Sequence, residues 1–143
     1  MKQIDILLVE DNEGDIVLTM EALDDARILN KVTVKRDGAE ALEFLFNLAA
    51  NDPNALPDLI LLDINLPKID GKEVLNQVKT HTVLKKIPVV MLTTSSSEGD
   101  IVESYNNHAN CYIIKPVDLN KFFNIVKAIE NFWITIVKLP EKE

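Results

Sequence analysis

Cysteine, basic residues and long apolar runs are scarce in this sequence, and each shortage excludes a class of protein. The single cysteine, Cys111, has no partner for an intrachain disulfide. No apolar run approaches the ~18 residues of a transmembrane helix, and the first five residues, which include an acid, do not resemble a signal peptide. Lys and Arg number 15 against 23 Asp and Glu, which argues against nucleic acid as the main partner. We therefore expect a cytoplasmic protein that binds neither nucleic acid nor a membrane.

The remaining composition is that of an ordinary globular domain. The 143 residues suit one domain with a full hydrophobic core, and 47% of them are hydrophobic. No linker and no internal repeat interrupts the chain. The formal net charge of -8 is compatible with the binding of a divalent cation.

The most informative segment is 57–67, in which apolar residues 59–62 run directly into Asp63 and Pro67 stops the run. A short continuous apolar run is typical of a strand buried on both faces of a parallel sheet. An Asp at the end of such a strand lies where the sheet opens to ligands. Taken alone, a strand-end Asp usually only caps or solvates the strand, so the rest of the chain decides its role.

Five strands alternate with five helices along the chain. The predicted strands are residues 4–9, 32–34, 59–63, 87–92 and 111–114. The predicted helices begin at Asn12, Asp37, Asp70, Ser97 and Asp118, and they run to about residues 26–29, 49, 78, 108 and 133, with a loop at 50–57. This alternation predicts a single doubly wound α/β domain, a parallel sheet with helices on both faces, whose ligands bind at the carboxyl ends of the strands.

Polar side chains follow four of these strands at that edge. Glu10 and Asp11 follow the first strand, Asp63 ends the third, Thr93 follows the fourth and Lys115 follows the fifth. Three crowded carboxylates need a cation, and their oxygen atoms suit Mg²⁺. A lysine and a hydroxyl beside them form an oxyanion-binding set. The set predicts phosphoryl transfer to Asp63.

At this point the sequence resembles the receiver domains of bacterial two-component response regulators, over about residues 4–130. The motifs that carry the resemblance are Val9-Glu10-Asp11-Asn12, Leu61-Leu62-Asp63-Ile64-Asn65-Leu66-Pro67, Asp70-Gly71, Leu92-Thr93-Thr94 and Tyr112-Ile113-Ile114-Lys115-Pro116. The resemblance implies the strand order 2-1-3-4-5. It also implies a signalling switch, not a conventional enzyme, that catalyses only its own phosphorylation and dephosphorylation.

The resemblance assigns the metal and the phosphoryl group to specific residues. Asp63 would be the phosphoacceptor for a phosphohistidine on a sensor histidine kinase. Glu10, Asp11 and Asp63 would hold Mg²⁺, together with the backbone carbonyl of Asn65. Glu10 stands where many family members have Asp, and its longer side chain could reach the metal through water.

The resemblance also assigns the residues that would read the phosphoryl group. Lys115 would pair with it and Thr93 would donate its hydroxyl. Tyr112 would be the aromatic switch residue, and the Lys115–Pro116 peptide bond would be cis. The change would then spread to the face formed by the fourth helix, the fifth strand and the fifth helix, where a downstream protein or phosphotransfer partner binds.

A narrower resemblance lies in residues 131–140 and in the long loop before Asp58, which look like the single-domain regulators of cyanobacterial phytochromes. It implies a phytochrome-type kinase. We expect an extended last helix and tail over about residues 118–143, without an output domain. Its surplus of apolar residues either packs on the domain's own core or forms a homodimer interface. The residues of that interface would be Phe122, Phe132, Trp133 and Ile136.

Three alternatives stay open. A Mg²⁺-dependent phosphohydrolase of the haloacid-dehalogenase type would carry an acid two residues after Asp63, where this chain has Asn65. A flavodoxin-like flavin protein would need a phosphate-binding loop after the first strand, where this chain is acidic. A degenerate receiver would bind partners independently of phosphorylation. Neither His81 nor His108 is expected to bind metal or transfer phosphate.

Overall fold

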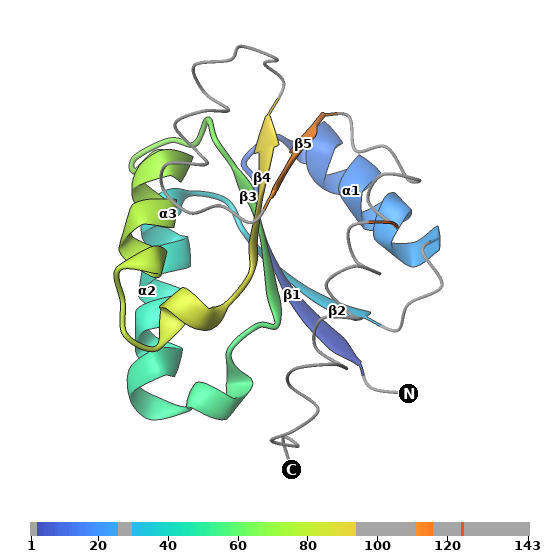
Figure 1. The fold of residues 1–143 in the computed structure, drawn as a ribbon. Helices are drawn as coiled ribbons and strands as arrows, with labels where there is room; N and C mark the ends of the chain where they lie inside the picture. Colours follow the sequence, from blue (N-terminus) through green and yellow to red (C-terminus); the bar gives the residue numbers. More distant parts are fainter. Residues whose placement is uncertain (1–2, 26–29, 94–110, 116–123, 125–143) are drawn as a thin grey trace.

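The protein is built on a five-stranded parallel sheet (Figure 1). The computed structural model describes residues 3–25, 30–93, 111–115 and 124. The strands are β1 (Ile4–Val9), β2 (Asn30–Lys35), β3 (Leu59–Asp63), β4 (Val89–Thr93) and β5 (Cys111–Ile114). Their order is β2-β1-β3-β4-β5, and every neighbouring pair is parallel. The doubly wound fold and its strand order are therefore confirmed.

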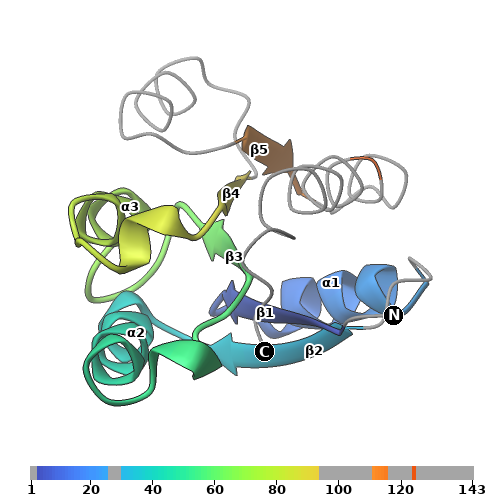
Figure 2. The ribbon, with the colours of Figure 1, turned by 60° about the horizontal axis from the view of Figure 1, so that its bottom comes forward.

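Helices cover both faces of the sheet. The helix α1 (Glu13–Asp25) lies on one face, and α2 (Gly38–Asn51) and α3 (Gly71–Lys79) lie on the other (Figures 1 and 2). Three of the five predicted caps lie in the described residues and are present: Asn12, Asp37 and Asp70 each accept a hydrogen bond from the backbone N–H three residues later. These caps fix where each helix begins, immediately beyond the carboxyl end of a strand or the turn that follows it.

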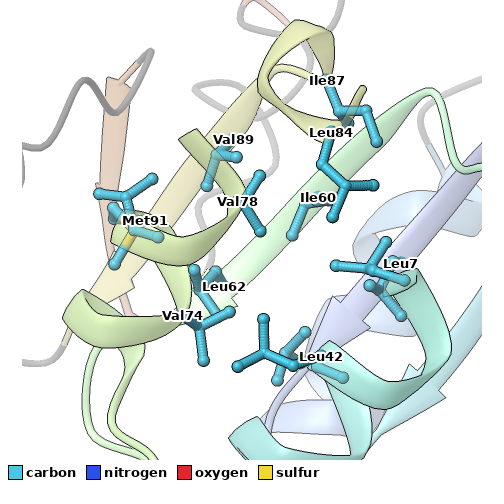
Figure 3. Close-up of a cluster of buried hydrophobic side chains, with 14 of the residues drawn as sticks. Leu7, Leu42, Ile60, Leu62, Val74, Val78, Leu84, Ile87, Val89 and Met91 are labelled. Atoms are coloured by element: carbon cyan, nitrogen blue, oxygen red, sulfur yellow. The ribbon is translucent and has the colours of Figure 1, made fainter. Parts of the chain in front are cut away.

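Successive strand residues face opposite sides of the sheet, so the chain builds two cores. On the α2 and α3 side, Ile60 and Leu62 of β3 pack with Val74 and Val78 of α3 (Figure 3). On the α1 side, Leu59 and Leu61 of β3 belong to the same buried cluster as Ile16 and Leu23 of α1. All five residues of β3 are buried, because both faces of this central strand are covered.

Several boundaries differ from the sequence-based expectation. The strand β2 is longer, and α2 runs to Asn51 into the expected loop, which also holds the short 3-10 helix η1 (Pro53–Ala55). The strand β4 begins at Val89, two residues late, because Ile87 ends the 3-10 helix η2 (Leu84–Lys86) and Pro88 has no N–H for the ladder. The end of the first helix and the helices expected at 97–108 and 118–133 lie outside the described residues.

Candidate functional site

The carboxyl ends of β1, β3 and β5 place their polar side chains on the α1 side of the sheet. The ladder extends one residue beyond two strands: the N–H of Glu10 donates to the Lys35 carbonyl at 3.0 Å, and the N–H of Lys115 donates to the Thr93 carbonyl at 2.7 Å. The core on the α1 side includes Leu8, Leu61 and Ile113. These residues stand two positions before Glu10, Asp63 and Lys115, respectively. Alternation along the strands therefore brings these three side chains together.

The ammonium group of Lys115 is the centre of the cluster. Its Nζ donates to Oε1 of Glu10 at 3.0 Å, to Oδ2 of Asp63 at 3.2 Å and to Oδ2 of Asp15 at 2.8 Å. A lysine has three N–H donors, so all of them are used. The Lys115, Glu10 and Asp63 side chains are 6%, 0% and 3% exposed, whereas Asp15 is 25% exposed. Two buried carboxylates and one at the rim share a single cation.

Backbone N–H groups hold the other oxygen of each buried carboxylate. The N–H of Asn12 donates to Oε2 of Glu10 at 3.2 Å. The N–H of Asn65 donates to Oδ1 of Asp63 at 3.1 Å. Each carboxylate is therefore fixed by a turn on one side and by the lysine on the other, which holds its oxygens still.

The same burial changes the protonation of the cluster. Burial raises the pKa of the Glu10 carboxyl to about 7, and the neighbouring Asp63 adds to the increase. Burial alone would lower the pKa of Lys115, but hydrogen bonds to Asp15 and Glu10 outweigh it and hold that pKa above its ordinary value. The lysine therefore stays charged, while Glu10 exchanges a proton near neutral pH.

Three carboxylates of this edge fit a divalent cation. Glu10, Asp11 and Asp63 each offer one oxygen, and these atoms lie within 4.8 Å of one another. Glu10 and Asp63 are buried, whereas Asp11 is exposed. Hard oxygen donors of this kind suit Mg²⁺ or Mn²⁺ and leave room for water ligands. The Asn65 carbonyl, predicted as a further ligand, belongs to the turn after β3, and its role stays a prediction.

The turn after β3 leads into α3, and the first residue of that helix, Gly71, packs directly on the backbone of Asp63. The N–H of Gly71 donates to the Ile64 carbonyl at 2.8 Å. A Cβ at Gly71 would collide with the carbonyl oxygen of Asp63 and lie 2.7 Å from the Cα of Ile64. Only glycine allows the start of α3 to press against the backbone that carries Asp63.

The other predicted site residues are placed only in part. Thr93 is fully buried at the end of β4. Tyr112 is partly buried and packs against the core on the α2 and α3 side. Its role as a switch residue stays a prediction. Pro116 and the predicted dimer residues Phe122, Phe132, Trp133 and Ile136 lie outside the described residues, as does His108.

His81 has a structural role instead of a place in the site. Its Nδ1 accepts hydrogen bonds from the N–H groups of Val83 and Leu84 at 3.1 and 3.2 Å. Its ring also stacks on Phe46, with ring centroids 5.6 Å apart. These contacts shape the turn after α3.

Sequence reasoning missed Asp15. It lies in the first turn of α1, not at a strand end, and so the search of strand ends passed over it. A signal was present, because α1 begins directly after β1 and covers the face to which Glu10 and Lys115 point. An acid one turn into that helix can reach the same lysine.

Comparisons with known proteins agree with this geometry. The response regulator receiver domain family matches residues 6–127. Response regulator Rcp1 of Synechocystis sp. is 46% identical over 135 residues, which cover 94% of this chain and 92% of that protein.

Among the described residues, no helix has the length and apolar character needed to span a bilayer.

Solved structures give the same result. The phosphorylated cyanobacterial phytochrome response regulator RcpA is 50% identical, with a TM-score of 0.76 over 93% of this chain and 95% of that one. The Mn(2+)-bound form of Rcp1 is 45% identical, with a TM-score of 0.74 over 91% of this chain and 94% of that one. The narrower resemblance to phytochrome regulators is thereby confirmed. The chain belongs to the response regulator receiver domain family of two-component signalling.

Proposed function

We propose that the chain is a phosphorylation switch in which Asp63 accepts a phosphoryl group from the phosphohistidine of a sensor histidine kinase. One observation carries the proposal: Lys115 contacts the buried carboxylates of Glu10 and Asp63, in an acid cluster that also includes the exposed Asp11. A lone acidic cluster would need only a cation. A cluster with its own lysine is also equipped to bind an anion attached to one of the acids.

The transfer uses groups of this chain. An oxygen of Asp63 attacks phosphorus and forms a new P–O bond, while the bond from phosphorus to the histidine nitrogen breaks and its electron pair stays on that nitrogen. The hydrogen bond from Asn65 to Oδ1 of Asp63 orients the nucleophile. Lys115 then binds a phosphoryl oxygen, and the Thr93 hydroxyl would donate a second hydrogen bond.

The donor set supports Mg²⁺ as the cofactor. Glu10, Asp11 and Asp63 would hold the ion together with the Asn65 carbonyl. When bound, Mg²⁺ supplies charge neutralisation and orientation of the phosphoryl oxygens. The Mn(2+)-bound form of the relative Rcp1 supports a divalent ion in this family.

A phytochrome-type kinase is the upstream partner that the comparisons favour, because RcpA is described as a phytochrome response regulator. The downstream reader would bind the face that includes β5. The cytoplasmic location expected from the sequence agrees with a histidine kinase as donor.

The test is incubation with a small phosphodonor, acetyl phosphate, and Mg²⁺, followed by intact mass spectrometry. We expect one phosphoryl group per chain, and none when a chelator removes the metal. No adduct under any of these conditions would refute the switch. Multiple turnover of a small phosphoester would instead support the phosphohydrolase alternative.

Metal binding should depend on the protonation of Glu10. Its pKa is raised from an ordinary 4.5 to about 7, so between these values the folded chain holds a proton that the unfolded chain has lost. The metal-free domain therefore loses stability from this group as pH rises through that window. Because Mg²⁺ must displace the same proton, its affinity should rise about tenfold per pH unit up to about pH 7.

Calorimetric titration with Mg²⁺ at a series of pH values checks this expectation. The matched variant Glu10→Gln should bind Mg²⁺ more weakly and should lose most of the pH dependence. An unchanged pH dependence in Glu10→Gln would assign the proton to another group.

A further inference from the structure

Within the described part of the chain, Asp15 is the one partner of Lys115 outside the predicted phosphorylation site. Its Oδ2 lies 2.8 Å from Nζ, the shortest of the three contacts of the lysine. It comes from the first turn of α1, whereas the other two acids come from the strand ends. The contact therefore ties a helix on one face of the sheet to the lysine that would bind the phosphoryl group.

We propose that Asp15 is a positioning residue. It holds Lys115 in place in the unphosphorylated site and disfavours the phosphorylated state. The inference rests on the proposed function, because it concerns the same lysine. It adds a competing anion to the site. Asp15 and the phosphoryl group would then compete for Lys115, and the outcome of this competition would set how readily Asp63 is phosphorylated.

The donor count supports competition. Lys115 has three N–H donors and uses all of them on Glu10, Asp15 and Asp63. A phosphoryl group on Asp63 adds oxygens that also need a donor, so the lysine must shift its contacts. Glu10 and Asp63 are buried, and Asp15 is 25% exposed, so water can replace the lysine most easily at Asp15.

Charge acts in the same direction. Asp15 and Asp63 contact the same nitrogen, at 2.8 and 3.2 Å, so their oxygens lie well inside the ~10 Å screening length of salt water. A phosphoryl group adds about two negative charges beside Asp15. Competition for the lysine and repulsion of the phosphoryl group therefore both disfavour the phosphorylated state.

The chain offers a matched control in the same helical turn. Glu13 carries the same charge as Asp15, but its Oε1 pairs with Nη1 of Arg36 at 2.7 Å, and both of these side chains are exposed. Asp15→Asn and Glu13→Gln therefore remove one charge each from the start of α1. Only Asp15→Asn removes a partner from Lys115.

The test measures binding of beryllium fluoride by ¹⁹F NMR at saturating Mg²⁺. Beryllium fluoride mimics the phosphoryl group and has no leaving group. We expect Asp15→Asn to bind it about three- to tenfold more tightly than the unchanged chain, the range for loss of one partly exposed competing ion pair. Glu13→Gln should stay within about twofold, because its charge is paired and solvated. The acetyl phosphate concentration for half-maximal phosphorylation should fall in parallel in Asp15→Asn alone.

Asp15→Glu separates positioning from a purely structural role. The longer carboxylate can still reach Lys115, so it should return the affinity toward that of the unchanged chain. Equal affinities in Asp15→Asn and Glu13→Gln, or weaker binding in Asp15→Asn, would overturn the role of Asp15. Failure of the unchanged chain to bind beryllium fluoride would instead overturn the proposed function.

Discussion

Asp63→Asn is expected to abolish the phosphoryl adduct while the fold is retained. The amide has nearly the shape of the carboxylate but lacks the oxygen nucleophile that attacks phosphorus. The core should be unaffected, because Lys115 keeps its contacts with Glu10 at 3.0 Å and Asp15 at 2.8 Å. Intact mass spectrometry after incubation with acetyl phosphate and Mg²⁺ measures the loss.

The same substitution at the other end of β3 is the control. Asp58 precedes the strand, and its Oδ2 accepts a hydrogen bond from the Asp5 N–H at 2.9 Å. Asp58→Asn therefore removes a charge from the same β-strand region but leaves the carboxyl edge unchanged, so its adduct should form normally. A phosphoryl adduct that survives in Asp63→Asn would place the acceptor elsewhere.

Lys115→Ala should have the largest effect on stability. It leaves Glu10 and Asp63, both buried, without the cation that they share. Removal of one partner from a buried ion pair costs about 3–5 kcal/mol in free energy of unfolding. Mg²⁺ should recover part of that loss, because it neutralises the same carboxylates. Urea unfolding of the variant with and without Mg²⁺ measures both quantities.

Lys79→Ala is the matched control for a lysine whose partners are not acids. Nζ of Lys79 donates to the carbonyl of Ile87 at 2.6 Å and to that of Lys85 at 3.2 Å. Its loss should lower stability, but Mg²⁺ should not reduce the damage beyond its effect on the unchanged chain. A Lys115→Ala variant that is as stable as the unchanged chain, or that responds to Mg²⁺ no more than Lys79→Ala does, would contradict the ionic role of Lys115.

The sequence was sufficient to predict the residues of the site that lie on or next to strands. Short apolar runs ending in Glu10, Asp63 and Lys115 indicated parallel strands, and such strands bring their carboxyl ends to one edge. Alternation along each strand then decides which of these side chains share a face. The structure brings these three side chains together, because Lys115 contacts both carboxylates. Asp11 has an oxygen within 4.8 Å of the oxygens of Glu10 and Asp63.

Features that depend on how elements pack could not be predicted in this way. Asp15 reaches Lys115 only because α1 packs on the face of the sheet toward which Lys115 points. No local sequence pattern specifies which face a helix covers. The late start of β4 depends on a 3-10 turn at 84–86, a structure with weak sequence signals. The dimer interface and the cis peptide bond after Lys115 concern residues outside the described part of the chain and stay predictions.

The role of Asp63 as phosphoacceptor is tested most directly by locating the phosphoryl group on the chain. The chain is incubated with acetyl phosphate and Mg²⁺ and then treated with borohydride, which reduces an aspartyl phosphate to homoserine, and its peptides are sequenced by mass spectrometry. We expect homoserine at Asp63 alone, and only when Mg²⁺ is present. Modification at another carboxylate, or an unmodified Asp63 in a chain that carries phosphate, would contradict this expectation.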